Sequence, residues 1–148
     1  MKRGLKIGLI TLVVLFLIIQ FIPRNYNQQG VTAANDLTQI IPVPENVGLL
    51  LKRSCYDCHS DHTDYPLYSW LQPIRLMMDR HVSKGKEELN FNEFGTYSAR
   101  KQRSKIRAIG EILEEGSMPL SSYTIIHRNA ILSKEDKVLL LNWVKQTN

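Results

Sequence analysis

The stretch Cys55-Tyr56-Asp57-Cys58-His59 determines which fold we expect for the chain. It fits the pattern C-x-x-C-H, the attachment signature of c-type haem. The spacing suits that chemistry, because two thiols three positions apart can each add to one vinyl group of the porphyrin, and the following histidine can ligate the iron. Both cysteines of the chain lie here, so no thiol is left for another purpose. The pattern predicts one covalent haem c per chain, held by Cys55, Cys58 and His59.

Three other chemistries fit parts of this stretch. A zinc site would need two more ligands, and His59 and His62 could supply them, although four ligands within eight residues are cramped. A thioredoxin-like redox pair needs a βαβ context, and no strand pattern precedes the motif. A disulfide between residues so close in sequence closes too small a loop to add much stability. Haem attachment explains all the residues at once.

An apolar run covers residues 7–22, reads IGLITLVVLFLIIQFI and is interrupted only by Gln20. It is short for a membrane-spanning helix, which usually needs about 20 residues. The alternative is a cleaved signal peptide, with a small-residue site at Thr32-Ala33-Ala34. That site lies farther from the apolar run than such sites usually do. We therefore expect residues 1–23 to be an uncleaved N-terminal transmembrane helix.

The charges beside this run predict its orientation. Lys2, Arg3 and Lys6 precede it and only Arg24 follows closely, so the N-terminus is expected in the cytoplasm. The predicted localisation is a single-pass inner-membrane protein with its haem domain on the periplasmic side. Covalent haem attachment takes place on that side of the bacterial inner membrane, so the two features agree.

The basic balance does not indicate nucleic acid as a partner. Lys and Arg number 19 and Asp and Glu number 14, which gives +5. Without Lys2, Arg3 and Lys6 the balance is 16 minus 14, or +2. A net charge of this size is ordinary for a solvated surface.

The rest of the chain has the patterns of an all-α domain. Residues 24–44 are polar and end in Ile41-Pro42-Val43-Pro44, which suits an extended linker. The haem-binding domain is expected over residues 45–148, with its first helix leading directly into the haem motif. Further helices are predicted from Pro73 to Gly85, from Ser98 to Glu115 with Gly116 as the stop, and after a capping box at Ser133-Lys134-Glu135-Asp136.

Three residues are candidates for the second axial ligand of the iron. Met118 lies on a loop between two helices and is followed by Pro119, which restricts the backbone. His81 lies on the apolar face of a predicted helix, where a hydrogen-bonded core histidine fits the same pattern. His127 lies in a loop, where a bond to the backbone is an adequate role. We predict Met118 as the distal ligand, with His81 as the alternative.

The chain resembles the small membrane-anchored haem-binding domain proteins of bacteria between Ile41 and about Val144. The resemblance rests on an ordered set of motifs: Cys55-Tyr56-Asp57-Cys58-His59-Ser60, Thr63-Asp64-Tyr65-Pro66 with Tyr68, His81-Val82-Ser83-Lys84-Gly85, Leu89-Asn90-Phe91, Gly116-Ser117-Met118-Pro119, Ser122-Tyr123, His127 and Leu132-Ser133. It implies a cytochrome c-like domain with one covalent haem, His59 as proximal ligand and Met118 as distal ligand.

Two function classes follow from these features. The first is an electron carrier between membrane or periplasmic redox proteins, attached to the lipid bilayer by the N-terminal helix. It requires two strong axial ligands, and the loop at Met118-Pro119 favours it. The second is a haem-based sensor or a peroxidase-like protein, which needs a labile distal site. We expect a non-enzymatic carrier rather than an enzyme.

Overall fold

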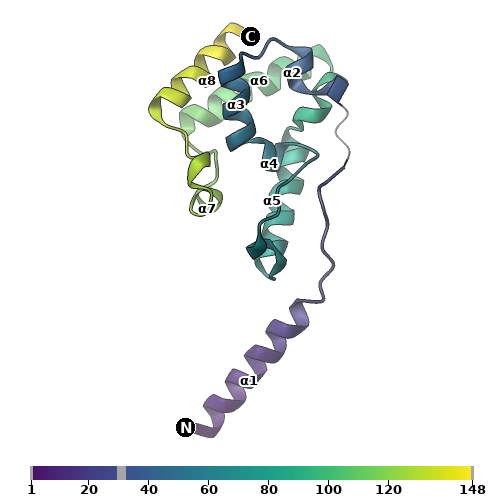
Figure 1. The fold of residues 1–148 in the computed structure, drawn as a ribbon, viewed down its shortest axis with the longest axis vertical. Helices are drawn as coiled ribbons and strands as arrows, with labels where there is room; N and C mark the ends of the chain where they lie inside the picture. The colour runs from purple at the N-terminus through teal and green to yellow at the C-terminus, as the bar shows by residue number, and fades with distance from the viewer. Residues whose placement is uncertain (1, 30–32, 148) are drawn as a thin grey trace.

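The computed structural model describes residues 2–29 and 33–147, and its regular structure in this part of the chain is helical (Figure 1). No β-strand forms within these residues, where a lone bridge joins Gln28 and His62. The expected all-α character is therefore present. The α-helices are α1 (Lys2–Ile19), α2 (Leu37–Ile40), α3 (Glu45–Ser54), α4 (Tyr56–His59), α5 (Ile74–Glu88), α6 (Ala99–Glu115), α7 (Ser121–Thr124) and α8 (Lys134–Thr147). Short 3-10 helices are η1 (Ala33–Asn35), η2 (Leu67–Trp70), η3 (Phe91–Thr96) and η4 (Arg128–Ala130).

The predicted transmembrane helix is wrong. Within the described residues, no helix combines the length and the apolar character that crossing a bilayer requires. The reason lies at both ends of α1, which extends away from the other helices in Figure 1. Its first turns contain three basic residues, and it ends at Ile19, before the apolar run does. The single-pass inner-membrane localisation and the bilayer contact depended on this helix, so both are withdrawn.

Residues 20–29 connect α1 to the domain through specific contacts. The Gln20 side chain accepts a hydrogen bond from the backbone N–H of Gln72 at 3.0 Å and donates to its carbonyl at 3.3 Å. Asn27 donates from its amide nitrogen to the Ser60 carbonyl at 2.8 Å and to the Thr63 hydroxyl at 2.9 Å. Part of the stretch expected to be a linker is thus packed on the domain. Thr32, in the alternative cleavage site, lies outside the described residues.

A buried arginine lies at the centre of these contacts. Arg75 is only 1% exposed, and its guanidinium lies over the rings of Tyr26 and Tyr65 at 4.3 and 4.1 Å. Its Nε donates to Asp79 at 2.7 Å, and a second nitrogen donates to the carbonyl of Asn25. A charge buried this deeply is stable only when it is paired and hydrogen-bonded, as it is here.

The hydrophobic core lies where α3, α6 and α8 meet beside η3 (Figure 1). Apolar residues at helical spacing give each helix one buried face. The Trp143 indole in α8 also donates to the Pro42 carbonyl at 3.1 Å, which fixes the chain before α3. The least exposed core side chains are Leu37, Val47, Leu51, Phe91, Phe94, Ile106, Ala130 and Leu140.

The helix boundaries follow local chemistry with one exception. Ser133 and Asp136 exchange side chain–backbone bonds of 3.0 Å in both directions, so the predicted capping box is confirmed. Gly116 ends α6 with φ of 70°, a left-handed conformation that favours glycine. The exception is Gly85, which was expected to end its helix. Instead α5 continues to Glu88, because Gly85 lies against α4 and its missing side chain permits that close approach.

Candidate functional site

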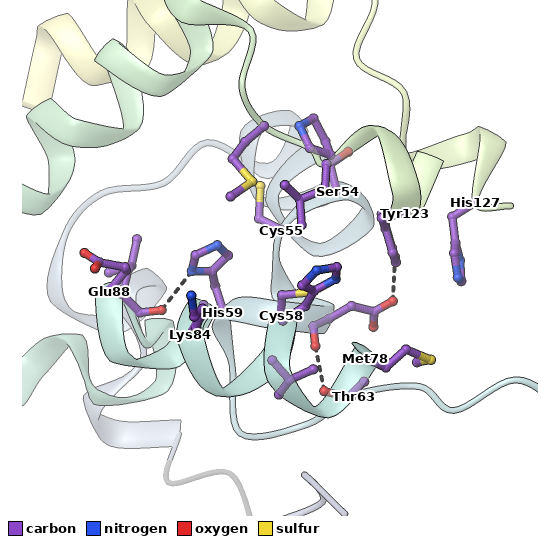
Figure 2. Close-up of a pocket in the computed structure, with 18 of the residues that line it drawn as sticks. Ser54, Cys55, Cys58, His59, Thr63, Met78, Lys84, Glu88, Tyr123 and His127 are labelled. Carbon is purple, nitrogen blue, oxygen red and sulfur yellow. Dashed lines mark hydrogen bonds between the residues drawn. The ribbon is translucent and has the colours of Figure 1, made fainter. Parts of the chain in front are cut away.

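A cavity of about 520 Å³ lies among α4, α5, α6 and the segment from Met118 to His127 (Figure 2). This volume falls in the range of roughly 300–1,000 Å³ that is common for cofactor sites. The cavity brings together residues from distant parts of the sequence, and much of its wall is aliphatic. All of the predicted site residues line it: Cys55, Cys58, His59, His81, Met118 and His127.

His59 is oriented as a metal ligand would be. Its Nδ1 lies 3.0 Å from the Leu89 carbonyl oxygen, which can only accept, so Nδ1 carries the proton. Nε2 is then the nitrogen with a free lone pair, and a backbone carbonyl is a common partner of ligating histidines. Burial lowers the pKa of His59, which keeps the imidazole neutral. The residue therefore fits the proximal role that the sequence predicts.

Cys55 and Cys58 are both free thiols beside His59 at the cavity (Figure 2). Burial raises the pKa of Cys55 to about 12 and that of Cys58 to about 11, so both are protonated at neutral pH. Neutral sulfur atoms and a neutral imidazole suit an apolar macrocycle with a central metal. The chemistry of this donor set fits haem.

A polar atom in the cavity wall also fits a bound group. The Ser54 hydroxyl is buried and has no hydrogen-bond partner within the described chain. Buried polar atoms in native proteins are nearly always bonded, so a lone one calls for an explanation. An occupant of the cavity would supply the partner.

The zinc alternative does not match the geometry. Within residues 2–29 and 33–147, no group of three or more His, Cys, Asp and Glu side chains could hold a metal ion. His62, which was needed as a ligand, lies 3.6 Å from Asp64 and is outside the cavity that His59 lines.

Met118, the predicted distal ligand, and His81, its alternative, line the same cavity from different elements. His81 comes from α5, and Met118 comes from the loop before α7. Both are half-buried. His81 has no side-chain hydrogen bond within the part of the chain that the structure describes, so the alternative role of a hydrogen-bonded core histidine is not supported.

A cluster of aromatic and acidic residues in the cavity wall was not predicted. The Tyr123 hydroxyl donates to Asp57 Oδ2 at 2.5 Å, and its ring stacks on His127 with centroids 4.2 Å apart (Figure 2). His127 Nε2 is hydrogen-bonded to the Tyr68 hydroxyl at 2.5 Å, a side-chain partner that the sequence did not indicate. Burial and the bond to Asp57 raise the pKa of Tyr123, which keeps it a donor.

Little in the sequence could have revealed this cluster. Asp57 occupies one of the unrestricted positions of the C-x-x-C-H pattern, and Tyr123 follows it by 66 residues. The one available indication was that both residues belong to motifs on which the family resemblance rests.

Comparison with known proteins indicates the same cofactor. The sequence model of a family described as "Haem-binding domain" matches residues 14–146. Cytochrome c peroxidase Ccp of Escherichia coli (strain K12) is 25% identical over 112 residues, which covers 72% of this chain and 24% of the relative. The chain therefore spans about a quarter of that protein's length. No solved structure matches it significantly.

Proposed function

Because the chain belongs to the haem-binding domain family, we propose that it is a monohaem, c-type cytochrome-like protein that transfers electrons between redox proteins. The observation that carries the proposal is the cavity in which two thiols adjoin an oriented imidazole. When bound, haem supplies an iron that changes its oxidation state by one electron.

Cys55 and Cys58 would hold the group covalently. In each addition the sulfur would form a bond to one vinyl carbon, and the thiol hydrogen would go to the other carbon. The vinyl double bond would be consumed, with no leaving group and no need for an oxidant or reductant. Covalent attachment would keep the group in place even though the cavity is partly open.

His59 would provide the proximal nitrogen, with the Leu89 carbonyl fixing its tautomer and ring orientation. The aliphatic wall would exclude water from the metal, and it contains Ile74, Val82, Ile109, Ile112 and Leu113. Exclusion of water and a thioether ligand would both affect the reduction potential of the haem. Methionine ligation raises that potential relative to a second histidine.

Met118 is proposed as the distal ligand, with His81 as the alternative. Met118→Ala should make the iron accessible to carbon monoxide and lower its potential, while haem stays attached. His81→Ala should leave the iron closed. The measurement is the optical spectrum of the full chain, oxidised and reduced, with and without carbon monoxide. The opposite pattern would identify a bis-histidine protein and remove Met118 from the site.

A second candidate is a sensor or peroxidase-like protein with a labile distal site. The likeness to cytochrome c peroxidase Ccp favours it, although it covers only 24% of that protein. The same spectra separate the two candidates. An unaltered chain that binds carbon monoxide in the ferrous state and consumes peroxide with an electron donor would support the second candidate and contradict the carrier.

A further inference from the structure

The segment that carries Met118 is held to the domain by few contacts. From Met118 to Asn129 its backbone hydrogen bonds are all local, and α7 is a single turn. Two of its large apolar side chains, Ile125 and Ile126, are 64% and 55% exposed, and Leu120 is only half-buried, so burial does little to secure the segment. In Figure 1 the segment projects from the domain as a loop between α6 and α8.

Two side-chain hydrogen bonds link this segment to other parts of the described chain. Tyr123 donates to Asp57 in α4, and His127 is bonded to Tyr68 in η2. The rings of Tyr123 and His127 are nearly parallel, at 10°, so the two bonds belong to one stacked unit. Asp57, which accepts the bond from Tyr123, lies between Cys55 and Cys58 in the sequence.

We propose that Tyr123, supported by His127, is a positioning residue that fastens the Met118 segment to the haem-attachment motif and so keeps Met118 at the cavity. This inference rests on the proposed function. The bond spans the cavity wall from α7 to α4, and its acceptor lies within the turn that carries both thiols. Movement of the segment away from α4 must break it. Tyr123 thereby acts on the iron only through Met118.

Tyr123→Phe tests the proposal in the full-length holoprotein, because it removes one hydroxyl and retains the ring that stacks on His127. We expect the rate of carbon monoxide binding to ferrous iron to rise about tenfold or more, the factor that loss of one hydrogen bond to a charged group would produce. The potential should shift toward that of Met118→Ala. Amide exchange over residues 118–127 should accelerate, and haem should remain attached.

Tyr56→Phe is the matched control. Tyr56 lies next to Asp57 in the same turn and also bonds to an aspartate, with its hydroxyl 3.2 Å from Asp36, but that bond leads away from the Met118 segment. The optical spectrum and the carbon monoxide binding rate of the Tyr56→Phe holoprotein should match those of the unaltered chain, even if the variant is less stable.

The outcomes separate the two proposals. If the unaltered protein is closed to carbon monoxide and Tyr123→Phe is equally closed, with unchanged exchange over residues 118–127, the positioning role is overturned and the carrier stands. If Tyr56→Phe opens the iron as much as Tyr123→Phe, the effect is general loosening and the role is also overturned. If the unaltered protein already binds the gas, the carrier proposal fails, and the positioning role fails with it.

Discussion

Gly85 lies in direct backbone contact with Cys58. A Cβ atom added at Gly85 would come within 2.5 Å of the Cys58 carbonyl oxygen and 3.1 Å of its carbonyl carbon. A glycine inside a helix costs about 0.5–1 kcal/mol relative to alanine, so its presence in α5 needs a reason. The reason is that any side chain here would push the turn bearing the haem motif away from α5.

Gly85→Ala should therefore lower the free energy of unfolding, by about 1–3 kcal/mol as for other overpacked sites. Gly48→Ala is the control, because Gly48 lies inside α3 and its added Cβ would meet only Val43 Cγ1 at 3.8 Å. That substitution should be neutral or stabilising. The measurement is urea unfolding of both variants. Equal stabilities would show that the contact with Cys58 is not restrictive.

Arg75 should be necessary for the packing of the N-terminal segment. Arg75→Ala removes the charge that pairs with Asp79 and the surface on which Tyr26 and Tyr65 stack, and we expect a loss of about 3–5 kcal/mol. The stability of Arg75→Lys should lie between those of Arg75→Ala and the unaltered chain, because lysine keeps the charge but lacks the planar guanidinium.

Limited proteolysis gives a second readout of the same prediction. Cleavage within residues 20–29 should accelerate in Arg75→Ala and remain slow in Arg80→Ala, which changes an exposed arginine of the same helix. Slow cleavage in both variants would mean that Arg75 does not hold the segment.

Asp136 should make the start of α8 sensitive to acid. The backbone N–H of Ser133 and the Arg53 guanidinium bind this carboxylate and hold its pKa below the usual value. The contribution of Asp136 to the free energy of unfolding is therefore complete above its unfolded pKa of about 4, and it is lost as pH falls through the lower pKa of the folded state.

Asp136→Asn should cost about 1 kcal/mol or less at pH 7, and the difference from the unaltered chain should shrink at about pH 3. Glu135→Gln changes the exposed carboxylate next to it and serves as the control. The measurement is urea unfolding of each chain at both pH values. A difference in unfolding free energy between Asp136→Asn and the unaltered chain that is the same at both pH values would contradict the acid sensitivity assigned to Asp136.

Features that depend on adjacent residues were predictable from the sequence. The capping box at Ser133 needs only a hydroxyl and a carboxylate three positions apart, and Gly116 needs only a preceding helix. The C-x-x-C-H pattern is equally local, which is why Cys55, Cys58 and His59 could be predicted as neighbours in one site before the cavity that they line was seen.

Features that depend on tertiary contacts were not. Gly85 has the pattern of a helix end, and only the approach of Cys58 shows why α5 continues past it. The bond between Tyr123 and Asp57 joins residues with no shared periodicity. The transmembrane helix was wrongly predicted for another reason. The apolar run in the sequence continues to Ile22, but the helix ends at Ile19 and includes the basic residues before the run.

The central claim is that Cys55 and Cys58 bind haem covalently in the cavity beside His59. The most direct test is the mass of the full chain, purified with its cofactor and measured after denaturation, together with that of a Cys55→Ala/Cys58→Ala variant that keeps His59. We predict that the unaltered polypeptide retains the added mass of one haem and that the double variant has the mass of the polypeptide alone. An unaltered chain that releases its haem on denaturation, or that carries stoichiometric zinc instead, would contradict the claim.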